Sequence, residues 1–247
     1  GEHEIDRPLT RHDADQPAAP LAGDPFNRMR PGFKLTPTMI HKAIQAIVIG
    51  DLLQNVMLRT RPYEAEPGSA DALYRHWDAV AGEFFTTGGW SATLRRRVSY
   101  RWLIDHIVTA FDQLAVRDEP RRPRVGLVGE ILVKFQPDAN NDAVRTIEAE
   151  GCEAVLPDLL PFFMMQLHTA GWRLDNLGVG STTGVKLQQG IAWFIEQYQR
   201  PARRALTKAE RDFTVSQPLA EIARRAESVI SLGTTAGEGW LLVGEMM

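Results

Sequence analysis

The sequence predicts an α/β protein in which a helical N-terminal half is followed by a Rossmann-like half with a parallel sheet. Apolar residues recur at helical spacing from residue 36 to about 115, and segment 123–157 has the pattern strand, helix, strand. Its length matches a βαβ unit, and helical patterns return after it. We therefore expect an irregular segment over 1–35, a helical region over 36–122 and a Rossmann-like region over 123–247 that continues beyond the chain end.

Proline and capping residues set the boundaries in the first half. Five prolines among charged residues indicate an extended segment before residue 36. Thr36 and Pro37 then form a helix start, and Pro62 ends that helix. Ser69 begins a second helix, which the glycine pair at 88–89 ends. The expected helices span residues 36–61, 69–87 and 91–115.

Short apolar runs and helical patterns alternate in the second half. The expected strands cover 124–130 and 153–157, with a third possible strand at 229–232. Asn140, Asn141 and Asp142 precede a helix between the first two strands, and further helices are expected at 159–167, 183–198 and 220–228. The apolar run from Trp240 to Met247 is expected to be covered by a further strand or by a partner chain.

The composition limits the class of protein. The 247 residues contain 28 Lys and Arg against 31 Asp and Glu, a net charge of −3, and one cysteine. These values are typical of a globular chain and exclude collagen, a disordered tail and a disulfide-rich scaffold. No apolar run is long enough for a membrane span, and no signal segment opens the chain, so we expect a cytoplasmic protein without a membrane partner. The missing initiator Met indicates a fragment.

Two classes of partner are disfavoured. The arginines at 95–97 and 101 are a possible phosphate-binding cluster, but such a cluster is more often a solvated helix face, and with a negative net charge we expect no nucleic acid. The six histidines form no metal-binding pattern, and Cys152 alone cannot hold zinc or an iron–sulfur cluster. We therefore expect no metal ligands in this chain.

The first candidate site follows the first expected strand. Gly129 and Glu130 stand at its carboxyl end, Lys134 lies in the loop, and Asn140 and Asn141 begin the next helix. A helix N-terminus and a lysine attract an anion, and a carboxylate exchanges a proton, so Glu130 and Lys134 are candidate catalytic residues. The alternative stays open that an asparagine only caps the helix and that Glu130 pairs with Lys134.

The second candidate site lies near the end of the chain. Gly237, Glu238 and Gly239 belong to a loop of small residues that permits close backbone approach to a cofactor, although such loops often only connect elements. Glu245 stands in an apolar run, where a carboxylate must be paired or protonated. We therefore add Glu245 to the candidate catalytic residues.

Three blocks of sequence resemble a known family. They are the run from Pro123 to Asp142 with the run from Glu150 to Pro157, the segment Gly50–Leu53 followed by Arg61–Glu64, and Gly237–Leu242 followed by Gly244–Met246. In this order they resemble the acyl-CoA dehydratase activase-related proteins, which are similar to the activator and dehydratase subunits of 2-hydroxyglutaryl-CoA dehydratase.

The resemblance implies a function that the composition does not reveal. It implies a cytoplasmic component of an ATP-driven electron-transfer system that serves a [4Fe-4S] dehydratase of 2-hydroxyacyl-CoA thioesters. The family's cysteine-bearing stretch would follow residue 247, and no ATPase phosphate-binding motif occurs in the chain, so the cluster ligands would lie outside it. Two alternatives stay open: a non-catalytic scaffold that binds a partner protein, and a module that binds acyl-CoA without redox chemistry.

Overall fold

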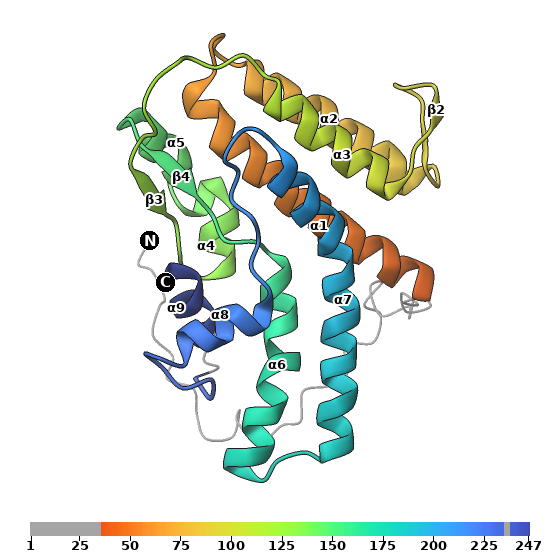
Figure 1. Cartoon of the computed structure of the whole chain (residues 1–247), viewed down its shortest axis with the longest axis vertical. Coiled ribbons are helices and arrows are strands. Elements are labelled where there is room, and N and C mark those ends of the chain that lie inside the picture. The colour runs from red at the N-terminus through yellow and green to blue at the C-terminus, as the bar shows by residue number, and fades with distance from the viewer. Residues whose placement is uncertain (1–35, 235–237) are drawn as a thin grey trace, which may run out of the picture. The chain divides into compact units, whose positions relative to one another are not determined.

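The structure is a computed structural model that describes residues 36–234 and 238–247. These residues are mostly helical and carry two small two-stranded sheets. Pro37–Met247 form one compact unit, which Figure 1 shows with its longer helices side by side. In the described part of the chain, no helix is long and apolar enough to cross a membrane.

The helices expected in the first half are present with one correction. Helix α1 covers Pro37–Thr60, a 3₁₀ turn covers Arg61–Tyr63, and α2 covers Ser69–Thr86, so the first two predictions are confirmed. The prediction of a helix over 91–115 is wrong in its first part. There β1 (Trp90–Ser91) and β2 (Arg96–Arg97) form an antiparallel hairpin, and α3 covers only Tyr100–Asp112.

Local side-chain chemistry explains this hairpin. Arg95 has a positive φ of 49°, a conformation that no helix interior accepts. The carboxylate of Glu83 accepts hydrogen bonds from the hydroxyls of Ser91 and Thr93 at 2.7 and 2.8 Å. Ser99 then caps α3, since its side chain accepts the backbone N–H of Trp102. The apolar periodicity of this segment therefore belongs to a helix that begins about nine residues later than predicted.

The second half contains the expected parallel strand pair. Strand β3 (Arg124–Gly126) pairs with β4 (Glu153–Val155) in parallel, with Val125 opposite Ala154. The chain between them forms α4 (Ile131–Phe135), a 3₁₀ turn (Pro137–Ala139) and α5 (Ala143–Ala149), as Figure 1 shows. The predicted order of strand, helix and strand is confirmed, although both strands are shorter than expected. The α/β character is thus present in the described residues as a two-stranded parallel sheet.

The rest of the chain is helical. Helices α6 (Leu160–Leu177) and α7 (Thr182–Lys208) are longer than predicted and pack against each other. Helix α8 covers Leu219–Ala226, and the strand expected at 229–232 is wrong, because residues 227–230 turn back on α8 and the N–H of Ile230 donates to the carbonyl of Ala226. The apolar end of the chain forms α9 (Gly239–Met246). Trp240 and Leu241 of this helix are buried in the core of the chain itself. We expected a further strand or a partner chain to cover this run.

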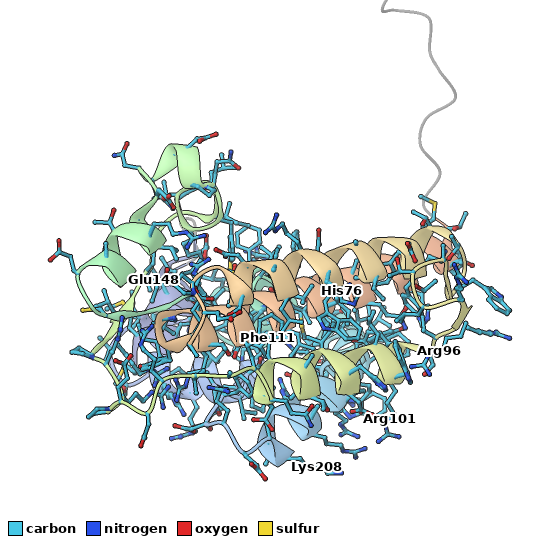
Figure 2. The ribbon with its side chains drawn as sticks, turned by 90° about the horizontal axis from the view of Figure 1, so that it is seen from above. His76, Arg96, Arg101, Phe111, Glu148 and Lys208 are labelled. Carbon is cyan, nitrogen blue, oxygen red and sulfur yellow. The ribbon has the colours of Figure 1, made fainter. Side chains whose placement is uncertain are left out.

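One hydrophobic core joins the two halves. It includes Val56 on α1, Phe111 on α3, Leu160 on α6 and Leu241 on α9, each at most 2% exposed. Figure 2 labels Phe111 among the side chains of this core. Burial of this apolar surface is the main stabilising contribution to the fold.

Ion pairs tie the end of α1 to the strand pair. The guanidinium of Arg61 bonds the carboxylate of Glu148 at 2.8 Å and that of Asp71 at 3.0 Å, and Glu148 is labelled in Figure 2. The buried carboxylate of Glu153 accepts from Arg121 at 2.9 Å and from the hydroxyl of Tyr63 at 3.0 Å. Bidentate arginine pairs of this kind fix orientation, so β4 has a defined position relative to α1.

Candidate functional site

A cleft of about 620 Å³ opens at the carboxyl ends of the two parallel strands. Its lining includes the residues that follow β3 and β4, the loop at 214–217, and residues of α8 and α9. The carboxyl ends of parallel strands are the usual location of ligands in α/β proteins, and the volume is in the range of small-molecule sites. Much of the lining is apolar, including Val128, Val155, Pro161, Ile222 and Met246. The cleft is therefore the main candidate site.

Glu245 is a predicted site residue that lies in this cleft. Its Oε2 atom is buried and has no hydrogen-bond partner among the residues that the structure describes. Burial raises the pKa of Glu245 from its ordinary value of 4.5 to about 8; Lys134 opposes this increase, and the negative charges of Asp158 and Glu238 add to it. The side chain is therefore a neutral carboxylic acid over much of the physiological pH range.

The neighbouring glycine fixes the position of Glu245. A Cβ atom on Gly244 would lie 2.3 Å from the carbonyl oxygen of Ile222, so only glycine allows α9 to lie this close to α8. Trp240 and Leu241 lie on the same face of α9, one turn before Gly244, and are buried in the core. The carboxyl of Glu245 is thus attached to a helix whose buried face is closely packed.

Lys134 and Glu238 form a buried ion pair. Their Nζ and Oε2 atoms are 2.5 Å apart, and the two residues are 2% and 5% exposed. The structure thus brings together two predicted site residues that are 104 positions apart in the sequence. It also shows that Lys134 pairs with Glu238 and not with Glu130, so the alternative pairing that we left open is wrong. The lysine charge compensates a protein carboxylate instead of being free for an anion.

Two aspartates beside the cleft were not predicted. Asp158 lines the cleft three residues after the end of β4, and Asp51 on α1 is its neighbour. Burial raises the pKa of both carboxyls; the charge of Asp158 raises that of Asp51 further, whereas a hydrogen bond from Ser216 and the charge of Arg203 oppose the increase at Asp158. Asp51 also accepts the backbone N–H groups of Leu159 and Leu160 at 2.8 and 3.1 Å, so it caps α6. The sequence signal that could have identified Asp51 is its position as an acidic residue inside the apolar pattern of α1.

The other predicted site residues have local roles or lie elsewhere. Glu130 is exposed and caps α4 by accepting the N–H of Leu132 at 2.9 Å. Asn140 donates to the carbonyl of Val133 and accepts the N–H of Ala143, while Asn141 is exposed. Asn140 and Lys134 border a separate cleft of about 220 Å³.

Of the three glycines of the expected cofactor site, the two that the structure describes, Gly129 and Gly239, do not line the main cleft. Gly129 is half-buried in the loop before α4. Gly239 begins α9 where an added Cβ would meet the carbonyl oxygen of Thr234 at 2.7 Å, so this glycine permits a close backbone contact within the protein. Gly237 lies outside the described residues.

Two arginines give the cleft a positive component. Arg124 on β3 donates from Nη2 to the hydroxyl of Thr214 at 3.2 Å, and Arg225 on α8 lies 3.4 Å from the carboxylate of Glu221. Both line the cleft, with side chains that are 44% and 34% exposed. Arginine binds carboxylate and phosphate groups through its planar fork, so these side chains suit an anionic ligand group.

The described residues do not assemble a metal centre. Among them, no group of three or more His, Cys, Asp or Glu side chains could hold a metal ion. Cys152 is a free, half-buried thiol just before β4, and its Sγ atom is 4.0 Å from the carbonyl oxygen of Glu150. One thiol does not fit the four ligands of a [4Fe-4S] cluster.

The fold and the cleft together define a class: a mostly helical chain with a parallel strand pair and a ligand-sized cleft at its carboxyl end. No family model matches the chain, and neither the curated proteins nor the solved structures contain a significant match.

Proposed function

We propose that the chain is a component of an iron–sulfur, ATP-driven acyl-CoA dehydratase or activase-like electron-transfer system that acts on 2-hydroxyacyl-CoA-type thioesters. The observation that supports this most directly is the cleft, because it lies at the carboxyl ends of β3 and β4, two strands of the block that carries the family resemblance. In this proposal β3, β4 and their helices are part of a Rossmann-like region, and the protein is cytoplasmic.

The chemistry of the cleft fits an acyl thioester. Apolar side chains such as Val155 and Met246 suit an acyl chain, and the neutral carboxyl of Glu245 suits a carbonyl oxygen. Arg124 and Arg225 suit the phosphates of coenzyme A. The predicted roles of Glu130 and Lys134 in catalysis are not part of this proposal, because the first caps α4 and the second is paired with Glu238.

The cluster ligands come from outside this chain in the proposed system. Cys152 is a single thiol and is not one of the ligands in this proposal, so a further segment or a protein partner provides them. The chain itself contributes the binding cleft and its polar groups.

The test is the iron content of the intact gene product. Purified without oxygen, it is expected to be brown and to contain iron and sulfide in equal amounts, whereas the 247-residue chain alone binds neither. A colourless intact product without iron contradicts the proposal. The matched control is the Cys152→Ser variant of the intact product, which keeps its full iron content.

A second candidate is acyl-CoA binding without redox chemistry, which the arginines of the cleft favour. Coenzyme A esters are then expected to raise the melting temperature of the 247-residue chain, since a ligand that binds only the folded state stabilises it. Arg225→Ala is expected to reduce this increase. Lys134→Ala is less suitable as a test, because it also leaves the buried carboxylate of Glu238 without its partner. If coenzyme A esters at millimolar concentration leave the melting temperature unchanged, this candidate is contradicted.

A further inference from the structure

Glu245 lines the cleft, and its carboxyl has a hydrogen-bonding atom that no described residue uses. Oε2 is buried without a partner among the described residues, although buried polar atoms are nearly always hydrogen-bonded. An unpaired buried polar atom costs about 1 to 3 kcal/mol. The close contact of Gly244 with Ile222 fixes the backbone of α9 that carries this side chain.

Burial favours the neutral form of Glu245, and the charges around it act in both directions. Glu238, before α9, and Asp158, before α6, are acidic neighbours, and Asp51 on α1 lies beyond Asp158. Lys134 on α4 is the neighbouring cation, and its charge is compensated by the ion pair with Glu238. Arg124 on β3 and Arg225 on α8 line the same cleft, and they are paired with Glu153 and Glu221. Burial therefore keeps the proton on this carboxyl, which is then a hydrogen-bond donor.

The lining of the cleft limits which ligand groups can accept a hydrogen bond from Glu245. The remaining volume is lined mainly by apolar side chains, so the ligand has an apolar body with an acceptor oxygen at the end that reaches Glu245. A carbonyl oxygen or a carboxylate oxygen meets this requirement, and an O–H···O⁻ bond to a carboxylate is among the strongest that a neutral acid makes.

We propose that Glu245 donates a hydrogen bond from its carboxyl group to a carbonyl or carboxylate oxygen of a ligand whose aliphatic chain fills the cleft. The inference rests on the proposed function, because both place an acyl compound in the same cleft, and it adds the group that recognises the acyl oxygen. The ligand class is an acyl compound, either a free fatty carboxylate or its coenzyme A thioester. Binding then depends on one proton that the protein carries.

The experiment measures binding of hexanoate and of hexanoyl-CoA to the 247-residue chain by calorimetry at about pH 6.5 and about pH 9.5. With a pKa of about 8, the protonated fraction of Glu245 falls about 30-fold between these values, so the affinity is expected to fall by the same factor. Tighter binding of the thioester identifies coenzyme A esters as the source of the acyl group, and tighter binding of hexanoate identifies the free acid.

Variants separate the proton of Glu245 from other titrations. Glu245→Gln keeps a donor of similar shape but does not titrate, so its binding is expected to stay within a few-fold of the wild type and to be independent of pH. Glu245→Leu removes the donor and is expected to bind at least about tenfold more weakly at pH 6.5. Asp158→Asn removes the other titrating carboxyl of the cleft and is expected to retain the pH dependence. Glu150→Gln, an exposed carboxylate replaced by its amide, is the matched control and behaves as the wild type.

Three results overturn the inference: no binding of either probe, equal affinity at the two pH values in the wild type, or unchanged binding by Glu245→Leu. These results are distinct from a failure of the proposed function. Binding that depends on Glu245 in a protein whose intact gene product holds no iron supports the inference and contradicts the electron-transfer system. If the intact product contains iron but binding does not depend on Glu245, the electron-transfer system is supported and the inference is contradicted.

Discussion

Glu245 holds its proton more tightly in the folded chain than in the unfolded one. Its pKa is raised by burial from 4.5 to about 8, so between these values the folded state binds more protons than the unfolded state. The free energy of unfolding therefore falls as the pH rises through this window, by up to about 1.4 kcal/mol per pH unit from this group. The contribution is complete below pH 4.5 and is lost above pH 8.

Comparison with Glu245→Gln isolates this effect, because Asp51 and Asp158 titrate in both proteins. Urea unfolding at several pH values between about 5 and 8.5 is expected to show the wild type losing stability relative to the variant as the pH rises. Two curves that stay parallel over this range would show that Glu245 has no raised pKa.

The Lys134–Glu238 pair is the other residue-scale feature that decides stability. Lys134→Ala leaves a buried carboxylate without its partner and is expected to destabilise the chain by about 3 to 5 kcal/mol. Replacing both members together, Lys134→Met with Glu238→Leu, removes both buried charges and is expected to recover most of this loss. Denaturant unfolding of the two variants measures the difference. A single variant as stable as the wild type would mean that the pair is not buried in solution.

The residues of the site were predictable only in part. Lys134, Glu238 and Glu245 stand out in the sequence because they are charged residues in apolar or small-residue surroundings, but nothing local indicates that the first two meet. Asp51 reaches the backbone of Leu159 across 108 positions, a contact that depends on the packing of α1 against α6. Such pairs are set by tertiary packing, which single-sequence patterns do not report.

At the scale of elements, the contact between α8 and α9 depends on one glycine. Gly244→Ala places a methyl group 2.3 Å from the carbonyl oxygen of Ile222, so α9 must move away and stability is expected to fall by about 1 to 3 kcal/mol. Gly190→Ala on α7 is the matched control, because no atom lies within 4 Å of its added methyl group. That control is expected to gain about 0.5 to 1 kcal/mol from helix propensity. Thermal unfolding of both variants gives the comparison, and equal effects would contradict the close packing.

The elements also show where periodicity fails. The order of β3, α5 and β4 follows from apolar runs with turn residues between them, and these signals are local. The hairpin at Trp90–Arg97 has no such local pattern. Its hydroxyl side chains, Ser91 and Thr93, donate to the carboxylate of Glu83 on the preceding helix. The residues at 229–232 are apolar enough for a strand. The backbone at 229–230 instead forms hydrogen bonds with the end of α8, and among the described residues no strand pairs with this segment.

At the scale of the whole molecule, the core joins the two predicted regions. Leu53 on α1 is 1% exposed, and α1 contacts α2, α3, α6, α7 and β4. Leu53→Ala is expected to cost about 2 to 5 kcal/mol. Because the core is continuous, hydrogen exchange is expected to show the same loss of protection in α3 as in α6. Loss confined to α3 would indicate two regions that unfold separately.

The burial of Trp240 gives the cleft an optical reporter. This indole is 0% exposed and lies next to His168, with a distance of 5.9 Å between ring centroids. It belongs to α9, the same helix that carries Glu245. A change in polarity around this indole alters the emission of one of the six tryptophans in the chain, so comparison with the Trp240→Phe variant assigns a ligand-induced change in emission to α9.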